Sequence, residues 1–288
     1  MLWPQYTLGP RRCPSGAEVS GKASTLPMAP DPIDTQDVQK FWDRHPVAAA
    51  SIPAAPGTAE YFQGFDRLRE AMEPAALASR VYDFTAFAGQ RVLDVGAGNG
   101  FVMSRYARAG AQAFGVELTA RGVDLCRRRF AFEGVRALVT QGDAEHLPFA
   151  DASFDAVTSM GVLHHVPRPE RAIDEIHRVL KPGGRLTLML YHRNSAMYRL
   201  RFPLMRLLTG KSLAEQVNEV DGAGNPKGLV FSRREARAFV HRFSSVETFV
   251  GLLEPWMVAP GFSRVAKEAW LLPLAPRVGW FLYVKARR

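Results

Sequence analysis

The stretch that decides the fold is VLDVGAGNG, Val92 to Gly100. It is an apolar strand carrying an acid, Asp94, followed by alternate glycines and then by the helix-like stretch FVMSRYARA. Glycine tolerates left-handed backbone angles and lets a ligand approach the main chain closely. In an open α/β sheet, ligands bind at the carboxyl ends of the strands, which is where this turn is expected.

The same turn argues against a dinucleotide. In the register of Gly96 and Gly98, the dinucleotide fingerprint GxGxxG requires glycine at position 101, where this chain has Phe101. Glycine-rich turns of this kind also serve phosphates and plain tight connections. The glycine turn alone therefore does not identify the ligand, and the segments that follow it are needed.

Two further acids follow short apolar runs. Glu117 lies near the end of QAFGVEL and Asp143 follows ALVTQG, so both carboxylates are expected beside the glycine turn. Glu117 can accept hydrogen bonds from both hydroxyls of a ribose, and charge-assisted bonds are worth roughly 1.5–3 kcal/mol each. Asp143 can accept a hydrogen bond from an adenine amino group. The alternatives are a solvated acid at position 117 and a helix-capping Asp at position 143.

Strand patterns alternate with helix patterns through the middle of the chain. The strand patterns lie near 91–96, 112–118, 137–142, 154–160 and 185–191, and the helix patterns near 100–109, 119–132 and 169–180. This alternation predicts an α/β fold with a parallel sheet and helices on both faces. The last strands are expected at VETFVGL and GWFLYVKA.

Four linked segments carry a resemblance to a known family. They are VLDVGAGNG, FGVEL, GDAEHLPFADASFDAVTSMGVLHHV and RVLKPGGRL, between about Gln90 and Arg193. The chain resembles a class I S-adenosylmethionine-dependent methyltransferase with a type 11 domain, in the branch that includes ubiquinone and menaquinone methyltransferases. The resemblance implies a Rossmann-like, seven-stranded, mostly parallel sheet with an antiparallel last strand, and S-adenosyl-L-methionine as methyl donor.

The resemblance also implies which residues hold the cofactor. The glycine turn approaches the methionine part, Glu117 holds the ribose, and Asp143 with Ala144 binds the adenine. Asp94 steadies the turn or reaches the amino group through water, and its alternative is a purely structural strand acid. The full predicted set is Asp94, Gly96, Ala97, Gly98, Gly100, Glu117, Leu118, Asp143, Ala144 and Met160.

The methyl donor S-adenosylmethionine needs no metal ion and no covalent enzyme intermediate. Its methyl group is attached to a positively charged sulfur, so the leaving group is already activated and catalysis rests mainly on alignment. Orientation of this kind can lower a barrier by roughly 7–11 kcal/mol. The sequence has no metal-ligand spacing and no nucleophile elbow, and we expect no metal cofactor.

The acceptor side is expected after the fourth and fifth strands. The segment SMGVLHHV lacks the Asn/Asp-Pro-Pro-aromatic pattern typical of methylation of nucleic-acid bases, so a small-molecule acceptor and no specific nucleic acid are expected. His165 is a candidate general base because imidazole titrates near neutrality, although in relatives the pair with His164 looks largely structural. Tyr191 and His192 are candidates for positioning the acceptor.

Composition divides the chain into three parts. Residues 1–35 are expected to be a disordered tail, and residues 36–89 a helical cap over the substrate side. Residues 90–288 form the methyltransferase domain, with an acceptor-side insertion at about 192–231. Tyr61 and Arg67 reach the cleft from the cap or, alternatively, serve in core packing and a surface ion pair.

Charge leaves two alternatives open. The net charge is +9 and the pI about 9.9, with short clusters such as Arg127 to Arg129 interpreted mainly as solvated surface. A basic chain can bind an anionic membrane or nucleic acid, so a quinone or lipid methyltransferase at the membrane surface and a non-catalytic nucleotide-fold module stay possible.

The sequence has no apolar run of about 18 residues, and its two cysteines suggest no disulfide. A cytoplasmic location is the default expectation, and nothing indicates an oligomeric state.

Overall fold

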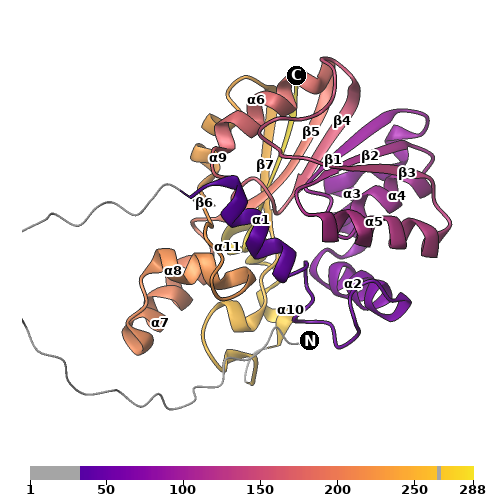
Figure 1. Cartoon of the computed structure of the whole chain (residues 1–288). Helices are drawn as coiled ribbons and strands as arrows, with labels where there is room; N and C mark the ends of the chain where they lie inside the picture. The colour runs from indigo at the N-terminus through magenta and orange to yellow at the C-terminus, as the bar shows by residue number, and fades with distance from the viewer. Residues whose placement is uncertain (1–32, 265–266) are drawn as a thin grey trace, which may run out of the picture.

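The computed structural model describes residues 33–264 and 267–288. The tail predicted at residues 1–35 lies almost wholly outside this part of the chain. A twisted sheet stands at the centre, and a second group of helices, including α2, α7, α8 and α10, gathers beyond one end of the strands (Figure 1). Helix α1 crosses the front of the molecule between these two regions.

The strands of the sheet lie side by side in the order β3-β2-β1-β4-β5-β8-β7. Strands β1 to β5 pair in parallel, whereas β8 is antiparallel to both β5 and β7. The seven-stranded prediction with an antiparallel last strand is confirmed, and a two-residue strand, β6, is added beside β5. The strands are β1 (Arg91–Val95), β2 (Gln112–Glu117), β3 (Ala137–Gln141), β4 (Phe154–Met160), β5 (Leu180–His192), β6 (Val230–Phe231), β7 (Ser244–Gly251) and β8 (Phe281–Arg287).

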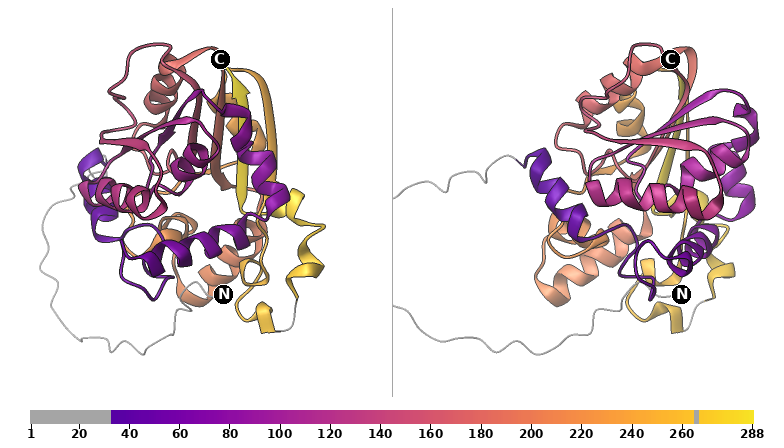
Figure 2. Two further views of the ribbon diagram at one scale, coloured as in Figure 1. Left: turned by 90° about the vertical axis from the view of Figure 1, so that its right-hand side faces the viewer. Right: turned by 45° about the vertical axis from the view of Figure 1, so that its right-hand side comes forward.

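Helices cover both faces of the sheet, as the two views of Figure 2 show. Short 3-10 turns lie at Phe84–Phe87, Glu219–Asp221, Pro255–Met257 and Phe262–Arg264, and a π-helical turn at Met197–Arg201. The α-helices are α1 (Thr35–Arg44), α2 (Ala59–Met72), α3 (Ala75–Tyr82), α4 (Phe101–Arg108), α5 (Ala120–Glu133), α6 (Pro169–Val179), α7 (Phe202–Thr209), α8 (Leu213–Asn218), α9 (Arg233–Phe239), α10 (Glu268–Leu271) and α11 (Ala275–Val278).

Alternation along the strands divides the buried apolar residues into two cores. Val92 of β1 packs in the core that includes residues of α2 to α5, whereas Leu93 packs in the core that includes residues of α6 and α9. Neighbouring strand residues point to opposite faces of a sheet, so a strand covered on both sides reads as a continuous apolar run. This explains why VLDV is apolar throughout except for its acid.

The order of the strands also locates the site. From β1 the chain continues outward to β2 and β3, and then returns to the other side of β1 to form β4 and β5. The strand order therefore reverses between β1 and β4. Crevices at such a reversal, outside the carboxyl ends of the strands, are where open α/β sheets bind ligands.

The start of β5 differs from expectation. The glycine-containing segment from Leu180 to Gly184 reads as a turn before the strand, but in the structure Leu180 already pairs with Phe154 of β4. The next pair is Ala156 with Arg185, so the residues between form a bulge. Gly183 has a φ of 77°, which is the left-handed backbone that such a bulge needs.

A buried polar cluster fastens the N-terminal helices to the sheet. The carboxylate of Glu73 accepts hydrogen bonds from Arg69 at 2.6 Å, from the Tyr82 hydroxyl at 2.8 Å and from the Tyr283 hydroxyl at 2.6 Å. Tyr283 belongs to β8, so one carboxylate joins α2 and α3 to the far side of the sheet. Burial raises the pKa of Tyr82 and of Tyr283 well above the ordinary tyrosine value.

A second buried charge corrects the interpretation of the arginine cluster as solvated surface. Arg129 is fully buried and pairs with Asp66 and Glu133, each at 2.7 Å, while its Nε donates to the carbonyl of Asn99. Its guanidinium also lies over the ring of Phe62, 4.7 Å from the centroid. Arg129 thus connects α2 and α5 to the residue that follows the second glycine of the turn.

No helix among the described residues is both long enough and apolar enough to cross a bilayer.

Replacing Glu73 by alanine should destabilise the fold. The change leaves the Arg69 guanidinium and two tyrosine hydroxyls without their shared acceptor, and breaking a buried ion pair costs about 3–5 kcal/mol. The free energy of unfolding, measured by urea denaturation, should fall accordingly. The control is Glu247→Ala, which breaks an ion pair with Arg80 whose side chains are about half exposed (55% and 52%) and should change the midpoint little. An equal effect of both changes would contradict this role of Glu73.

Candidate functional site

A cavity lies at the carboxyl ends of β1 to β4, beside the reversal in strand order. It is lined by the glycine turn, by residues that follow β2, β3 and β4, and by one face of α1. The predicted residues that line it are Gly96, Gly98, Glu117, Leu118, Asp143, Ala144, Met160 and His165. The structure thus brings most of the predicted cofactor set to one place.

The glycine turn has the backbone that only glycine adopts freely. Gly96 and Gly98 have φ values of 78° and 59°. A Cβ atom built at Gly96 would lie 2.3 Å from Cγ2 of Val162, so no larger residue fits there without a shift. At Gly98 the nearest atom to such a Cβ is Val47 Cγ1 at 3.4 Å, on the cavity wall. The turn therefore presents bare main chain to the cavity.

Glu117 connects the tips of two strands. Its Oε2 accepts a hydrogen bond from the Gly98 amide at 2.9 Å, and its Oε1 accepts from the amide and the hydroxyl of Thr119, both at 2.9 Å. Burial raises the pKa of this carboxyl group, and the hydrogen bonds from Thr119 and Gly98 lower it in part. An ionised carboxylate has about four lone-pair sites, so capacity remains toward the cavity.

Asp143 lies at the end of β3 and is the more open of the two acids, with its side chain 25% exposed. One oxygen accepts from the amide of Glu145 at 2.9 Å, and the other accepts from the hydroxyl of Thr35 at 3.3 Å. The first of these bonds caps the turn that follows β3. Asp143 therefore also has the capping role that the sequence left open as its alternative. The side chain still lines the cavity, next to the buried Ala144.

Three members of the predicted set do not line the cavity: Asp94, Ala97 and Gly100. Asp94 is 3% exposed, and its Oδ1 accepts a hydrogen bond from the Thr158 hydroxyl at 2.8 Å, which ties β1 to β4. Burial raises the pKa of Asp94 to about 7. Gly100 starts α4, where an added Cβ would lie 2.9 Å from the ring of Phe130. These residues support the turn from behind.

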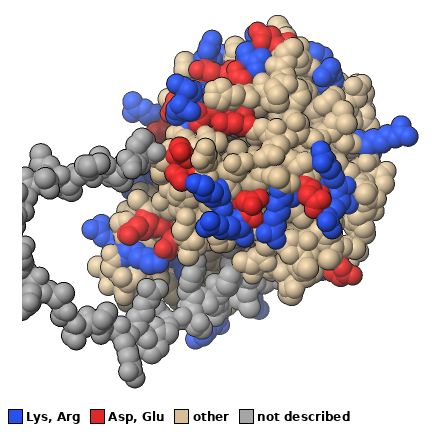
Figure 3. All heavy atoms as spheres, in the orientation of Figure 1, with Lys and Arg blue, Asp and Glu red and all other residues tan. Residues whose placement is uncertain are grey.

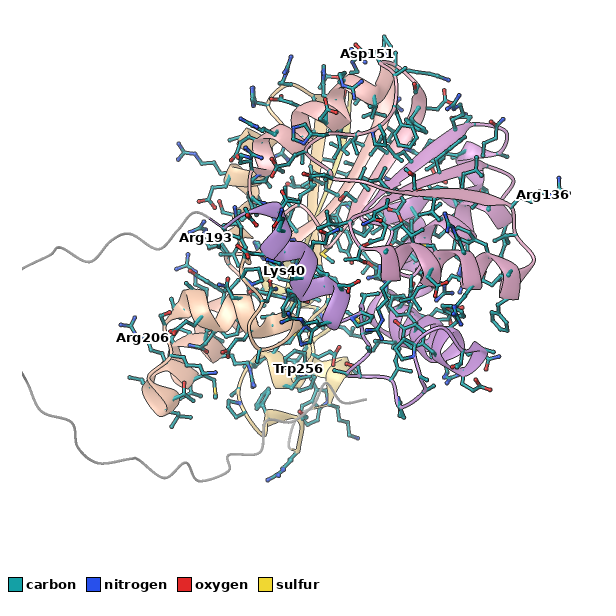
Figure 4. The ribbon with its side chains drawn as sticks, viewed as in Figure 1. Lys40, Arg136, Asp151, Arg193, Arg206 and Trp256 are labelled. Carbon is teal, nitrogen blue, oxygen red and sulfur yellow. The ribbon has the colours of Figure 1, made fainter. Side chains whose placement is uncertain are left out.

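Helix α1 covers the cavity, which the sequence did not predict. Thr35, Val38 and Trp42 line it, and Gln39 donates to the carbonyl of Leu118 at 2.8 Å. The helical cap predicted at residues 36–89 includes most of α1, but that cap was expected over the substrate side. In Figure 4 the labelled Lys40 marks this helix, lying across the strand ends.

The other cap residues considered for the cleft lie elsewhere. Tyr61 is completely buried and its hydroxyl donates to the carbonyl of Val47 at 2.6 Å, so its core-packing alternative describes it. Arg67 is exposed and lines no part of the cavity. Sequence reasoning also missed the wall formed by Pro46 and Val47 and the neighbouring Arg121. Only long-range packing brings these segments over the strand ends.

A polar cluster adjoins the cavity where β4 and β5 end. His165 has its Nε2 3.2 Å from Oδ2 of Asp221, and the hydroxyl of Tyr191 donates to the same oxygen at 2.6 Å. The ring of His164 lies against that of Tyr191, with centroids 3.9 Å apart, and both of its nitrogens are buried without a partner. Asp221 comes from the predicted insertion, and the sequence did not single it out.

His192 is separated from this cluster. It follows Tyr191 on β5 and so points to the opposite face, where its Nδ1 lies 3.1 Å from the carbonyl oxygen of Gly279. Burial lowers its pKa. Neither His192 nor Tyr191 lines the cavity itself, but Tyr191 reaches it through His165.

Comparison with known proteins identifies the fold and its family. The model of the family described as a methyltransferase domain matches residues 93–188. A demethylmenaquinone methyltransferase of Clavibacter sepedonicus is 41% identical over 179 residues, which cover 62% of this chain and 67% of that protein. The chain belongs to the S-adenosylmethionine-dependent methyltransferases.

Other relatives of this methyltransferase differ in how much they share with it. A demethylmenaquinone methyltransferase of Renibacterium salmoninarum is 33% identical over 184 residues, covering 63% of this chain and 70% of that protein. A fatty-acid O-methyltransferase of Mycolicibacterium smegmatis is 43% identical over 98 residues, covering 33% of this chain and 35% of that protein. The second relative matches over about a third of its own length, so the likeness is concentrated in the shared domain.

Solved structures show the same fold. A SAM-dependent methyltransferase of Thermotoga maritima, a possible histamine N-methyltransferase, has a TM-score of 0.53 at 21% identity and covers 87% of this chain and 99% of its own. The [4+2]-cyclase SpnF has a TM-score of 0.56 at 22% identity and covers 92% of this chain and 99% of its own. At this identity the likeness describes architecture alone.

Asp94→Asn should flatten the pH dependence of the stability of this methyltransferase. The folded-state pKa of about 7 lies above the ordinary value of 3.8, so the folded state binds this proton more tightly and loses stability as pH rises between these values. Asparagine keeps the bond from Thr158 and removes the titration.

Urea unfolding at pH 5 and pH 8 measures this effect, and the difference should be smaller in Asp94→Asn than in the wild type. The control is Asp151→Asn, an acid at the upper surface in Figure 4 with a 75% exposed side chain. It should keep the wild-type difference. Equal pH dependence of wild type and Asp94→Asn would show that Asp94 is ionised in the folded state throughout.

Proposed function

We propose that the cavity binds S-adenosyl-L-methionine and that the enzyme transfers its methyl group to an O, N or C atom of a small molecule. The single observation that carries this proposal is the convergence of Gly98, Glu117 and Asp143 on one cavity. The bare main chain at Gly98 suits the methionine part, the carboxylate of Glu117 the ribose hydroxyls, and Asp143 with Ala144 the adenine.

The proposed reaction needs alignment and exclusion of water. The nucleophilic atom of the acceptor attacks the methyl carbon, the carbon–sulfur bond breaks, and its electron pair stays on sulfur to give S-adenosylhomocysteine. Helix α1 supports this step because Val38 and Trp42 form an apolar wall that limits solvent. His165 lies at the inner end of the same cavity, where the acceptor is proposed to enter, with Tyr191 behind it.

Substitutions in the cavity should weaken cofactor binding. Glu117→Ala removes the acceptor of the ribose hydroxyls and the bond from the Gly98 amide, and Gly98→Val places a branched side chain on a backbone with positive φ. Each should lower the affinity for S-adenosylhomocysteine at least tenfold in isothermal titration, or about 1.4 kcal/mol.

The matched control is Glu247→Ala, which changes a half-exposed acid of β7 that does not line the cavity and should leave the affinity unchanged. Circular dichroism verifies that each variant is folded.

The reaction itself is tested with labelled methyl donor and a panel of quinols, hydroxy acids, amines and fatty acids. Absence of binding by the folded wild type, or unchanged affinity in folded Glu117→Ala, would remove the proposed site.

Acceptors that dissolve in membranes are favoured by one surface feature. Leu207 and Leu208 of α7 are 85% and 68% exposed, and Leu200 of the preceding turn is 55% exposed. Arg206 projects outward from the same helix (Figure 4). Exposed leucines beside cations suit the surface of an anionic bilayer. Together with relatives named for demethylmenaquinone, this favours a quinone-like acceptor taken at the membrane surface.

The rival function, binding of nucleic acid by a basic surface, gains less support. Basic and acidic side chains are interspersed over the face that Figure 3 shows. Several arginines among the described residues have acidic partners. Arg168 pairs with Glu145, and Arg178 pairs with Asp151 and Glu175. Paired charges contribute little to binding a polyanion. A small-molecule acceptor and a cytoplasmic location stay our proposals.

Vesicle flotation tests the membrane surface. The double change Leu207→Asp and Leu208→Asp should abolish flotation with phosphatidylglycerol vesicles, because acidic residues replace the apolar contact and repel the lipid. Leu138→Asp changes an equally exposed leucine, 67% exposed, at the far edge of the sheet and should float as the wild type does. If the wild type does not float, the acceptor is taken from solution.

A further inference from the structure

A group of metal-ligating side chains adjoins the cofactor cavity. His164, His165 and Asp221 each offer one ligand atom, and these atoms lie within 4.8 Å of one another. His164 and His165 are almost completely buried, and the Asp221 side chain is 16% exposed. Two imidazoles and one carboxylate are the ligand set of many sites for divalent transition metals that keep open positions.

The hydrogen bonds of His165 determine which of its nitrogens faces Asp221. Its Nδ1 lies at hydrogen-bond distance from the carbonyl oxygen of Lys227, and a carbonyl can only accept, so Nδ1 carries the proton. When the ring is neutral, Nε2 directs a lone pair at the carboxylate oxygen of Asp221, 3.2 Å away. A bond from Nδ1–H to a backbone carbonyl is also the usual way in which a metal-binding histidine is oriented.

The environment of His164 is more unusual than that of His165. Its ring is completely buried, and neither nitrogen has a hydrogen-bond partner among the described residues. An unsatisfied buried polar group costs about 1–3 kcal/mol, and this ring has two such atoms. In a neutral imidazole one of these nitrogens is unprotonated and can coordinate a metal ion.

The nitrogen and oxygen atoms that face one another in this group favour a bound cation. The Nε2 lone pair of His165, a carboxylate oxygen of Asp221 and a free nitrogen of His164 are all electron-rich, and the hydroxyl of Tyr191 donates only to Asp221. A cation is needed to bring such atoms together favourably, and it is either a proton on His165 or a metal ion. A proton on His165 would form a hydrogen bond to Asp221, but both nitrogens of His164 would stay without a partner.

We propose that His164, His165 and Asp221 bind one divalent transition-metal ion of the Zn²⁺ or Fe²⁺ class beside the cofactor cavity. Bonds to nitrogen and oxygen in such sites are about 2.0–2.2 Å, so two ligands of a tetrahedral ion are about 3.4 Å apart. The widest separation here is at most 4.8 Å, so closure requires a shift of about 1.4 Å or less.

The position of the ion suggests its role, and this part rests on the proposed methyl transfer. Three protein ligands leave at least one position open, and His165 lines the cavity. An acceptor hydroxyl bound there would lose its proton more easily, because a divalent cation lowers the pKa of a coordinated oxygen acid. The site therefore favours acceptors with an enol, phenol or quinol oxygen. His165 would then serve as a ligand and not as the base that the sequence suggested.

Co²⁺ binding to the full, untagged chain tests the site. After chelation and dialysis, the wild type should bind one Co²⁺ per chain and show the visible absorption of cobalt with nitrogen and oxygen ligands. Its melting temperature should rise with Co²⁺, because a ligand of the folded state stabilises it. His164→Phe and Asp221→Asn should each bind at least tenfold more weakly.

The control is His241→Gln, which changes an exposed histidine on the far side of β5 and should bind as the wild type does. His164→Phe keeps an aromatic ring, although a somewhat larger one, and removes the two unpaired nitrogens, so it should still fold without metal. If Asp221→Asn does not fold, His164→Phe alone decides the outcome.

Two results would overturn the inference: no stoichiometric Co²⁺ binding by the folded wild type, or wild-type binding by folded His164→Phe. Titration with S-adenosylhomocysteine on the same preparations separates this failure from failure of the proposed function. Normal cofactor binding without cobalt binding rejects the metal site alone, whereas loss of cofactor binding rejects the methyl-transfer proposal.

Discussion

The site depends on one buried carboxylate that joins two strand ends. Glu117 leaves β2 and receives the amide of Gly98 from the turn after β1, while Thr119 supplies an amide and a hydroxyl from the start of α5. Because the carboxylate is buried, these bonds form in a medium where they are strong, and the desolvated charge would be costly without them. The carboxylate therefore holds the glycine turn in place and at the same time faces the cavity where the ribose is proposed to bind.

The rest of the molecule maintains this arrangement from two sides. Behind the turn, Thr158 holds Asp94 and thereby joins β1 to β4, and Arg129 bonds to the carbonyl of Asn99. In front, α1 contacts the carbonyl of Leu118 through Gln39 and covers the cavity. A reaction that proceeds by alignment needs both, since small displacements of the reacting atoms reduce its rate strongly. The insertion before α9 adds Asp221, which contacts His165 and Tyr191 on the side where the acceptor is proposed to bind.

Family membership and reaction are separate questions in this fold. The fold is shared with proteins that include a methyltransferase and a [4+2]-cyclase. One scaffold can host different chemistry because the parallel sheet supplies only the position of the strand ends, while loops and insertions supply the reactive groups. In this chain we propose that those groups are His164, His165, Tyr191 and Asp221, which lie together where β4 and β5 end.

The amino-acid sequence by itself determined the mostly parallel sheet and most of the residues that line the cavity at its strand ends, because these depend on local patterns: apolar runs, a glycine turn and acids that follow the strands. It placed Glu117 and Asp143 correctly beside Gly98 for that reason. Only the tertiary structure decided that α1 covers the cavity, that Arg129 is buried, that His192 points away from Tyr191, and that Asp221 meets His165. These contacts join segments far apart in the chain, and their side chains carry no periodic signal, so packing alone brings them together.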